Sequence, residues 1–339
     1  MTASPTSRDR QVNADELPVL ADILAAEKRL APYLVRTPLV ESTLLNRRLG
    51  FRLLVKAECL QRTGSFKFRG ALNKLLQLDP KQRQHGVVAF SSGNHAQGVA
   101  AAAALLGIPA TIVMPKDAPS IKLANTRAYG AHVVTYDRWT ESREEIANRL
   151  AREQGATTVR PFDDRDIIAG QGTVGLEIVE QAGALGVELD TVVSGASGGG
   201  LVAGCALALA ARSPGTRVYS AEPEGYDDHA RSLKANRRVA NDPKSASICD
   251  ALMSPTPGEL TFAINRRHLA GGAVVSDAEI RAAMRTAFID LKLVIEPGGA
   301  AGLAAALTHR LPSGIETMAV VASGGNVDPM LFSEILTQE

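Results

Sequence analysis

Short apolar runs alternate with longer segments of helical spacing along most of the chain. The run 86–90 is apolar, and the Ala-rich segment 96–106 that follows it has the length and composition of a helix. Short strands that alternate with helices of ten or more residues predict βαβ units and a parallel sheet, so the expected fold class is α/β. The expected strands are 52–57, 86–90, 110–114, 132–136, 191–194, 217–221 and 318–322, and the expected helices are 21–34, 96–106, 120–129, 141–153 and 201–211.

The order of these units predicts two interleaved lobes rather than two independent modules. No internal repeat and no low-complexity linker separates one half of the sequence from the other. We therefore predict a large domain formed by residues 1–85 and 163–339 and a small domain formed by residues 86–162, with a ligand-binding cleft between them. The basic stretch 231–247 has few apolar residues and is interpreted as a solvated surface, with a mobile flap beside the site as the alternative.

Composition narrows the class of partner. Apolar residues make up 45% of the chain and charged residues 22%, and the net charge is +1 with both signs interspersed. Neither nucleic acid nor an anionic membrane is therefore an expected partner. No run approaches the roughly 20 apolar residues of a membrane span, and residues 1–16 lack the apolar segment of a secretory signal. Cys59, Cys205 and Cys249 form no CxxC pair, so we expect a cytoplasmic protein without a zinc site or a disulfide framework.

Lys67 is a candidate for covalent chemistry because Phe66 and Phe68 flank it. Apolar neighbours indicate partial burial, which disfavours the ammonium form and lowers the pKa of a lysine. A neutral amine can form a Schiff base with a carbonyl compound. Taken alone, the segment is also compatible with a surface lysine near the start of a helix.

A glycine-rich turn at 194–201 separates an expected strand from an expected helix. Its sequence is Ser-Gly-Ala-Ser-Gly-Gly-Gly-Leu. Consecutive glycines allow backbone N–H groups to surround an anion, and the N-terminus of the helix favours negative charge. The turn lacks the Lys-Ser/Thr ending of a nucleoside-triphosphate loop, so a monophosphate is favoured over ATP. A tight turn without a ligand is the alternative.

Two further turns follow expected strands and carry polar side chains. The turn 91–95 reads Ser-Ser-Gly-Asn-His, and donors at the carboxyl end of a strand suit a carboxylate or a ring hydroxyl. The turn 322–326 reads Ala-Ser-Gly-Gly-Asn and places Ser323 where it could reach a ring nitrogen. A packed histidine at His95 and a simple turn at 322–326 are the alternatives.

Taken together and in this order, the motifs resemble fold-type II pyridoxal-phosphate enzymes, most closely the group of threonine/serine dehydratases and serine racemases. The resemblance extends from Thr37 to Asn326, nearly the whole chain. It implies a tryptophan synthase β-like fold, two parallel-sheet lobes with pyridoxal 5′-phosphate in the cleft, a large domain that binds the cofactor, and a homodimer. The matching stretches are 63–71 (TGSFKFRGA), 91–99 (SSGNHAQGV), 169–173 (AGQGT), 197–201 (SGGGL), 296–300 (EPGGA) and 323–326 (SGGN).

The resemblance also implies roles for individual residues. Lys67 would bind the cofactor covalently and later move the α-proton of the substrate. Ser92 matches a serine that protonates the opposite face in serine racemases. The other implied cofactor contacts are Phe66 against the ring, Asn94 at the 3′ oxygen, Gly198, Gly199, Gly200 and Leu201 around the phosphate, and Ser323 at the pyridine nitrogen. The implied substrate contacts are Ser91, Ser92, Asn94, His95, Arg143 and Ser254.

A divalent cation is implied by the stretch 222–228, which reads Glu-Pro-Glu-Gly-Tyr-Asp-Asp. In the family, a Glu, a backbone carbonyl four residues on and an Asp six residues on bind the ion, which gives Glu222, Tyr226 and Asp228 here. Oxygen ligands suit Mg²⁺ or Ca²⁺, with Mn²⁺ as a further candidate. A solvated acidic loop is the alternative.

The reaction that the resemblance implies is elimination of water from a β-hydroxy amino acid. We expect L-threonine or L-serine to be converted to a 2-oxo acid and ammonia. A neutral hydroxyl at Ser323 favours this elimination, because it does not keep the pyridine nitrogen protonated. The alternatives are a serine racemase, which Ser92, Arg143 and Ser254 favour, and a hydroxyaspartate dehydratase, for which Arg143 is a candidate contact.

Two other interpretations are disfavoured. The motifs at 91–95 and 222–228 resemble the dehydratase branch rather than enzymes of sulfur-amino-acid synthesis. A non-catalytic binding module of the same fold would leave Lys67 and Ser323 without a purpose. The expected partner is therefore a small amino-acid substrate.

Overall fold

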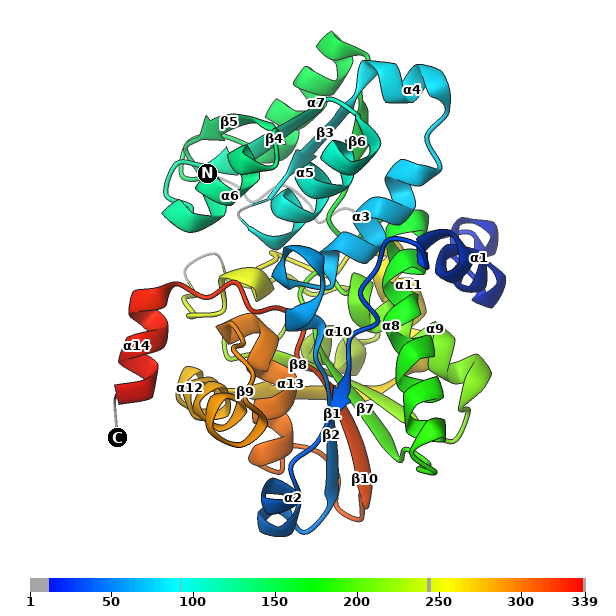
Figure 1. The fold of residues 1–339 in the computed structure, drawn as a ribbon, viewed down its shortest axis with the longest axis vertical. Coiled ribbons are helices and arrows are strands. Elements are labelled where there is room, and N and C mark those ends of the chain that lie inside the picture. Colours follow the sequence, from blue (N-terminus) through cyan, green and yellow to red (C-terminus); the bar gives the residue numbers. More distant parts are fainter. Residues whose placement is uncertain (1–11, 92, 243–244, 338–339) are drawn as a thin grey trace.

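The computed structural model describes residues 12–91, 93–242 and 245–337, which form two lobes, each built on its own sheet (Figure 1). The larger sheet has the strand order β1-β2-β10-β7-β8-β9, in which β1 pairs antiparallel with β2 and the other pairs are parallel. The smaller sheet has the order β5-β4-β3-β6 and is parallel throughout. The predicted α/β class with two parallel-sheet lobes is confirmed. The strands are β1 (Leu39–Val40), β2 (Arg52–Lys56), β3 (Val87–Phe90), β4 (Ala110–Pro115), β5 (His132–Tyr136), β6 (Thr157–Val159), β7 (Thr191–Gly195), β8 (Arg217–Pro223), β9 (Leu269–Val275) and β10 (Thr317–Val321).

The small lobe, at the top of Figure 1, comes from one continuous part of the chain. Its strands lie inside the predicted small domain 86–162, although the domain boundaries themselves stay a prediction. Alternate strand residues pack in opposite directions: Val87 and Ile112 belong to the core under α5 (Asn94–Leu106), whereas Val88 belongs to the core under α7 (Arg143–Gln154). Helices on both faces of a parallel sheet account for its nearly continuous apolar strands.

Helix α8 (Arg165–Ala184) follows the small lobe in the chain and packs against α3 (Lys67–Leu76) and α9 (Gly200–Arg212). Two of its glycines stand where backbones approach closely. A Cβ at Gly170 would lie 2.7 Å from the Cα of Gly70, and one at Gly175 would lie 2.9 Å from the Cα of Cys205. Because α8 packs against both helices, it helps to position the first residues of α3 and α9. These first residues, Lys67 and Gly200, line the cavity described below. The other helices are α1 (Leu20–Leu30), α2 (Thr43–Leu49), α4 (Pro80–His85), α6 (Ser120–Ala128), α10 (Asp228–Ala235), α11 (Glu259–His268), α12 (Asp277–Thr286), α13 (Pro297–Leu307) and α14 (Pro329–Thr337), with short turns η1 (Ala14–Glu16), η2 (Glu58–Leu60), η3 (Arg62–Gly64), η4 (Asp250–Leu252) and η5 (Ala287–Leu291).

Each strand and helix expected from the alternation is present, although the first helix ends at Leu30 rather than at residue 34. The solvated surface predicted for 231–247 is wrong in part. The beginning of this stretch belongs to α10, and Ser232 and Asn241 are buried. Arg231 donates to the Asn241 side chain, and the Ser232 hydroxyl accepts from the N–H of Val239 at 2.8 Å, so a lack of apolar residues did not signal exposure. Residues 243–244 lie outside the described part of the chain.

Among the helices that the structure describes, none is long and apolar enough to cross a bilayer.

Candidate active site

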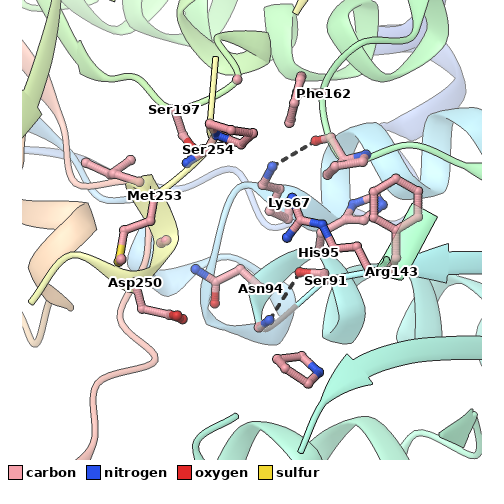
Figure 2. A pocket seen from close by; sticks show the side chains of 18 of the residues that line it. Lys67, Ser91, Asn94, His95, Arg143, Phe162, Ser197, Asp250, Met253 and Ser254 are labelled. Carbon is pink, nitrogen blue, oxygen red and sulfur yellow. Dashed lines mark hydrogen bonds between the residues drawn. The ribbon is translucent and has the colours of Figure 1, made fainter. Parts of the chain in front are cut away.

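A cavity of about 520 Å³ lies between the two lobes and is lined by residues of both (Figure 2). Three turns reach it from the carboxyl ends of strands: Ser91 follows β3, Ser197 lies just beyond β7, and Ser323 lies just beyond β10. Ligand sites of α/β proteins occur at this end of parallel strands. The structure thus brings together the turns at 91–95, 194–201 and 322–326 that the sequence singled out.

Lys67 is the first residue of α3, and its side chain enters this cavity. Its Nζ donates a hydrogen bond to the carbonyl oxygen of Pro161 at 2.8 Å and lies 5.1 Å from the centre of the Phe66 ring. Burial lowers the pKa of Lys67 from 10.5 to about 8. The neutral amine that Schiff-base chemistry requires is therefore far more populated near physiological pH than in an ordinary lysine, although the ammonium form still predominates.

The glycine turn between β7 and α9 has the geometry of an anion cradle. Gly199 precedes the first residue of α9 at φ +92°, a conformation that favours glycine. A side chain at Gly198 would clash with the ring of Phe162. The first N–H groups of α9, from Gly200 and Leu201 onward, have no partner within the helix. This turn fits a phosphate monoester, because small residues and free N–H groups coincide at a helix N-terminus.

The turn after β3 brings an amide and a neutral imidazole to the cavity. Asn94 donates from Nδ2 to Glu296 and accepts at Oδ1 from Asn326 at 2.8 Å. His95 Nε2 lies 3.1 Å from the carbonyl oxygen of Val159, which can only accept, so Nε2 carries the proton. Burial, with the nearby charge of Lys67, lowers the pKa of His95 to about 3. The imidazole is therefore neutral, and its Nδ1 is a free acceptor within the described residues.

Ser91 and Ser323 line the cavity as predicted, whereas Ser92 lies outside the described residues. The Ser91 hydroxyl accepts a hydrogen bond from the N–H of Gly93 at 3.1 Å. The carbonyl oxygen of Ser323 accepts one from the N–H of Phe66 at 3.1 Å, which ties the turn after β10 to the segment that carries Lys67.

Arg143 and Ser254 also reach the cavity (Figure 2). The Arg143 guanidinium lies over the ring of Phe90, 5.6 Å from its centre, and pairs with no carboxylate among the described residues. The Ser254 hydroxyl accepts a hydrogen bond from the hydroxyl of Ser197 at 2.7 Å, beside the glycine turn. The predicted substrate contacts that can be examined therefore share one cavity.

Lys122 and Asp250 line the cavity, and Glu296 contacts Lys122; the sequence analysis gave none of these three charged residues a role. Lys122 Nζ lies 3.3 Å from Asp250 Oδ2 and 3.5 Å from Glu296 Oε2. Glu296 begins the EPGGA stretch that carried the resemblance, yet that stretch suggested no role for the carboxylate. Lys122 lies within an ordinary amphipathic helix and gave no signal.

The predicted cation ligands Glu222, Tyr226 and Asp228 lie together at the end of β8 and the start of α10. The carboxylate of Glu222 accepts hydrogen bonds from the N–H groups of His229 and Ala230, each at 2.8 Å. Burial and the charge of Asp228 raise the pKa of Glu222 well above its ordinary value.

The second carboxylate of this set is incompletely satisfied. Asp228 accepts from Asn241 at Oδ1 (2.6 Å), whereas its Oδ2 has no hydrogen-bond partner in the described residues. Burial raises the pKa of Asp228 to about 7. A cation would compensate both charges, so these residues fit a divalent ion, although the described residues contain no cluster of three or more His, Cys, Asp or Glu side chains able to hold one. The cation stays a prediction.

Comparison with known proteins adds independent findings. The family model for "Pyridoxal-phosphate dependent enzyme" matches residues 30–324. The chain is 41% identical to an L-threo-3-hydroxyaspartate ammonia-lyase of Saccharomyces cerevisiae, over 95% of this chain and 97% of that protein. Among solved structures, maize serine racemase superposes with a TM-score of 0.89 at 41% identity, covering 94% of this chain and 96% of that one. The serine racemase of Dictyostelium discoideum gives a TM-score of 0.84 at 38% identity, covering 92% and 99%. A threonine deaminase gives 0.86 at 49% identity, also covering 92% and 99%.

The two-lobed fold, the lysine at the start of α3 and the glycine cradle define a fold-type II pyridoxal-phosphate enzyme. The chain belongs to the family of serine racemases, threonine dehydratases and hydroxyaspartate ammonia-lyases. Both the fold and the cofactor implied by the sequence motifs are thereby confirmed.

Proposed function

We propose that this enzyme is an ammonia-lyase for a β-hydroxy dicarboxylic amino acid, with threo-3-hydroxyaspartate as the model substrate. The observation that carries the proposal is Arg143, a guanidinium at the cavity with no carboxylate partner among the described residues. A planar guanidinium binds a carboxylate through two parallel hydrogen bonds. The ammonia-lyase of yeast that matches nearly the whole chain supports the same substrate class.

Different side chains of the cavity have different roles in the reaction. When bound, pyridoxal phosphate supplies an electron sink for negative charge at the α-carbon. Lys67 holds the cofactor and takes up the α-proton, because its lowered pKa makes it a base near neutral pH. The turn at Ser91 and Asn94 orients the α-carboxylate, and Arg143 holds the β-carboxylate.

The net reaction converts the substrate to a 2-oxo acid and ammonia, because the water lost in the first step is regained in the last. Removal of the α-proton and departure of the β-hydroxyl as water leave an enamine. The enamine tautomerises to an imine, and one water hydrolyses this imine to the 2-oxo acid and ammonia. Ser323 contributes a neutral neighbour rather than a carboxylate at the cavity, which suits elimination over reactions that need a stronger electron sink.

The test compares Arg143→Met with Arg138→Met. Arg138 also lines the cavity, but its guanidinium is already paired with Asp117 at 2.8 Å, so it serves as the matched control. Loss of the β-carboxylate contact should lower kcat/KM for hydroxyaspartate by about 100-fold or more, as when a polar recognition group loses its partner. The value for L-serine, which has no second carboxylate, should change by less than about threefold.

The assay is 2-oxo acid release from L-threo-3-hydroxyaspartate, L-serine and L-threonine in parallel. Equal losses on hydroxyaspartate and L-serine would contradict the role of Arg143. Dominant turnover of L-threonine or L-serine by the unmodified enzyme would replace the proposed substrate with the monocarboxylic one.

Racemisation of serine is a second candidate, supported by the match to maize serine racemase and by the serine at position 92. Ser92→Ala should abolish formation of D-serine while it spares most elimination from the L-substrate. Chiral analysis of the products from L-serine distinguishes the two activities, and equal loss of both would exclude a face-specific role for Ser92.

A further inference from the structure

Lys122 is a buried cation that belongs to one lobe and pairs with acids of the other. It lies on α6 of the small lobe, and its side chain is only 6% exposed. Its partners, Asp250 in η4 and Glu296 immediately before α13, belong to the large-sheet lobe. A lysine buried at this depth is costly unless it is paired. Lys122 therefore ties the two lobes together at the cavity.

The course of this side chain explains a glycine in the turn after β3. A Cβ at Gly93 would lie 2.8 Å from Lys122 Cδ and 3.0 Å from Nζ. The Lys122 side chain thus lies against Gly93, in the turn that presents Asn94 and His95. Burial by itself would lower the pKa of Lys122, but the Glu296 and Asp250 carboxylates raise it above its ordinary value, so the side chain stays charged.

Glu296 connects this cation to the amide of Asn94. One carboxylate oxygen faces Lys122 at 3.5 Å, and the other accepts a hydrogen bond from Asn94 Nδ2. On its opposite side, Asn94 Oδ1 accepts from Asn326 Nδ2, which also donates to the carbonyl oxygen of Thr63 at 2.8 Å. The amide is held at both ends, so its nitrogen faces Glu296 and retains a second N–H for a ligand.

We propose that Lys122 is a positioning residue of the active site. Through Glu296 it fixes the Asn94 amide with an N–H available to the ring oxygen of the cofactor, and through Glu296 and Asp250 it sets the separation of the lobes at the cofactor. This inference rests on cofactor binding at the proposed site and does not depend on which amino acid is the substrate.

The test uses three variants and no substrate. In Lys122→Met, the buried Glu296 carboxylate loses the cation that pairs with it. The carboxylate is then no longer held in place to accept the hydrogen bond from Asn94. The cofactor Kd should rise about tenfold or more, the range expected when a charged hydrogen-bond network loses one partner. The absorption spectrum of the bound cofactor at saturation should also shift, because the environment of its ring oxygen changes.

Lys74→Met is the matched control. Lys74 also pairs with two acids, Asp164 and Asp166, each at 2.9 Å, but none of these three residues lines the cavity. This variant should lose thermal stability while its cofactor Kd stays within about twofold of the wild type and its spectrum is unchanged. A purely structural role of Lys122 would give the same pattern in Lys122→Met.

The double variant Lys122→Met/Glu296→Gln tests whether the effect of Lys122→Met is transmitted by Glu296. Its glutamine is neutral, and its side-chain oxygen can still accept from Asn94, so affinity and spectrum should return toward wild type. If Lys122→Met alone does not fold, recovery of folding and of the spectrum in the double variant supports the proposal, and failure to recover overturns it. An unchanged spectrum and Kd in Lys122→Met also overturns it. Because no substrate is present, absence of hydroxyaspartate turnover would count against the proposed function only.

Discussion

At the scale of single residues, the environment of Lys67 has a direct chemical consequence. Its pKa is about 8 in the folded protein, against 10.5 for an ordinary lysine, because the side chain is buried. Between these two values the unfolded chain binds more protons than the folded one, so this group adds stability as the pH rises through that window. Below the window both states are protonated, and burial of the ammonium opposes folding.

The same shift predicts selective reactivity in the cofactor-free protein. Labelling of Lys67 by an amine-specific reagent should reach half its maximum near pH 8, because only the neutral amine reacts. Lys74 is the internal control, since the carboxylates of Asp164 and Asp166 outweigh its burial and raise its pKa. Peptide mass spectrometry over a pH series measures both. A common midpoint for the two lysines would show that burial does not tune Lys67.

The sequence could predict a site residue only where the role of that residue follows from its neighbours in the chain. Lys67, the glycine turn and Ser323 lie in short motifs whose chemistry follows from neighbours in the chain, and all of them line the cavity. Lys122 and Glu296 could not be predicted as a pair, because their contact exists only once two lobes have folded and met. A carboxylate before a proline and a lysine in a helix have ordinary local explanations.

At the scale of elements, α3 is anchored by a buried network of charges. Arg69 donates to Glu58 through Nε and Nη2, each at 2.8 Å, and to Glu177 at 2.7 Å, and its side chain is inaccessible to solvent. Lys56 Nζ donates to Glu177 as well, at 2.6 Å. The network joins β2, η2 and α8 to the helix that begins with Lys67, so it fixes the direction in which that helix enters the cavity.

Removing the centre of this network should be severely destabilising. Arg69→Met leaves two buried carboxylates with only one cation, and the free energy of unfolding should fall by about 3–5 kcal/mol. The control is Arg36→Met, which removes an exposed pair with Glu180 and should cost no more than about 1 kcal/mol. Urea unfolding of the two variants measures the difference. Similar losses would mean that the buried network is energetically no different from a surface pair.

A helix could be predicted from the sequence where one physical signal, such as an Ala-rich composition, dominated its segment. The helices α5 and α9 are Ala-rich, and their expected bounds nearly match the observed ones. Helix α8 gave no comparable signal, because Gly170, Gly172 and Gly175 lower intrinsic helix propensity. Close packing explains these glycines, because a Cβ at Gly170 or Gly175 would meet neighbouring backbone and one at Gly172 would meet the side chain of Ile23, and that packing is tertiary information.

At the scale of the whole molecule, the predicted cation site is connected to the active-site cavity. Asn241 donates to Asp228 and also to the carbonyl oxygen of Ser254, at 2.6 and 2.8 Å. The Ser254 hydroxyl in turn accepts from Ser197, beside the glycine turn. A cation at Asp228 would therefore stabilise β8, α10 and the segment that lines the cavity together, and its effect should appear in global unfolding.

The prediction is a rise in Tm on addition of Mg²⁺ or Ca²⁺ to protein previously treated with a chelator. An ion at about 100 times its Kd stabilises the folded state by about 2.7 kcal/mol, which corresponds to a shift of several degrees or more. Asp228→Asn should remove the shift, because it removes the charge of the buried carboxylate whose Oδ2 has no partner in the described residues. Asp227→Asn is the matched control, since Asp227 pairs with Arg231 at 3.0 Å and is not a predicted ligand. A shift that persists in Asp228→Asn would place the ion elsewhere, and the absence of any shift in the wild type would show that the Glu222–Asp228 segment is stable without a metal.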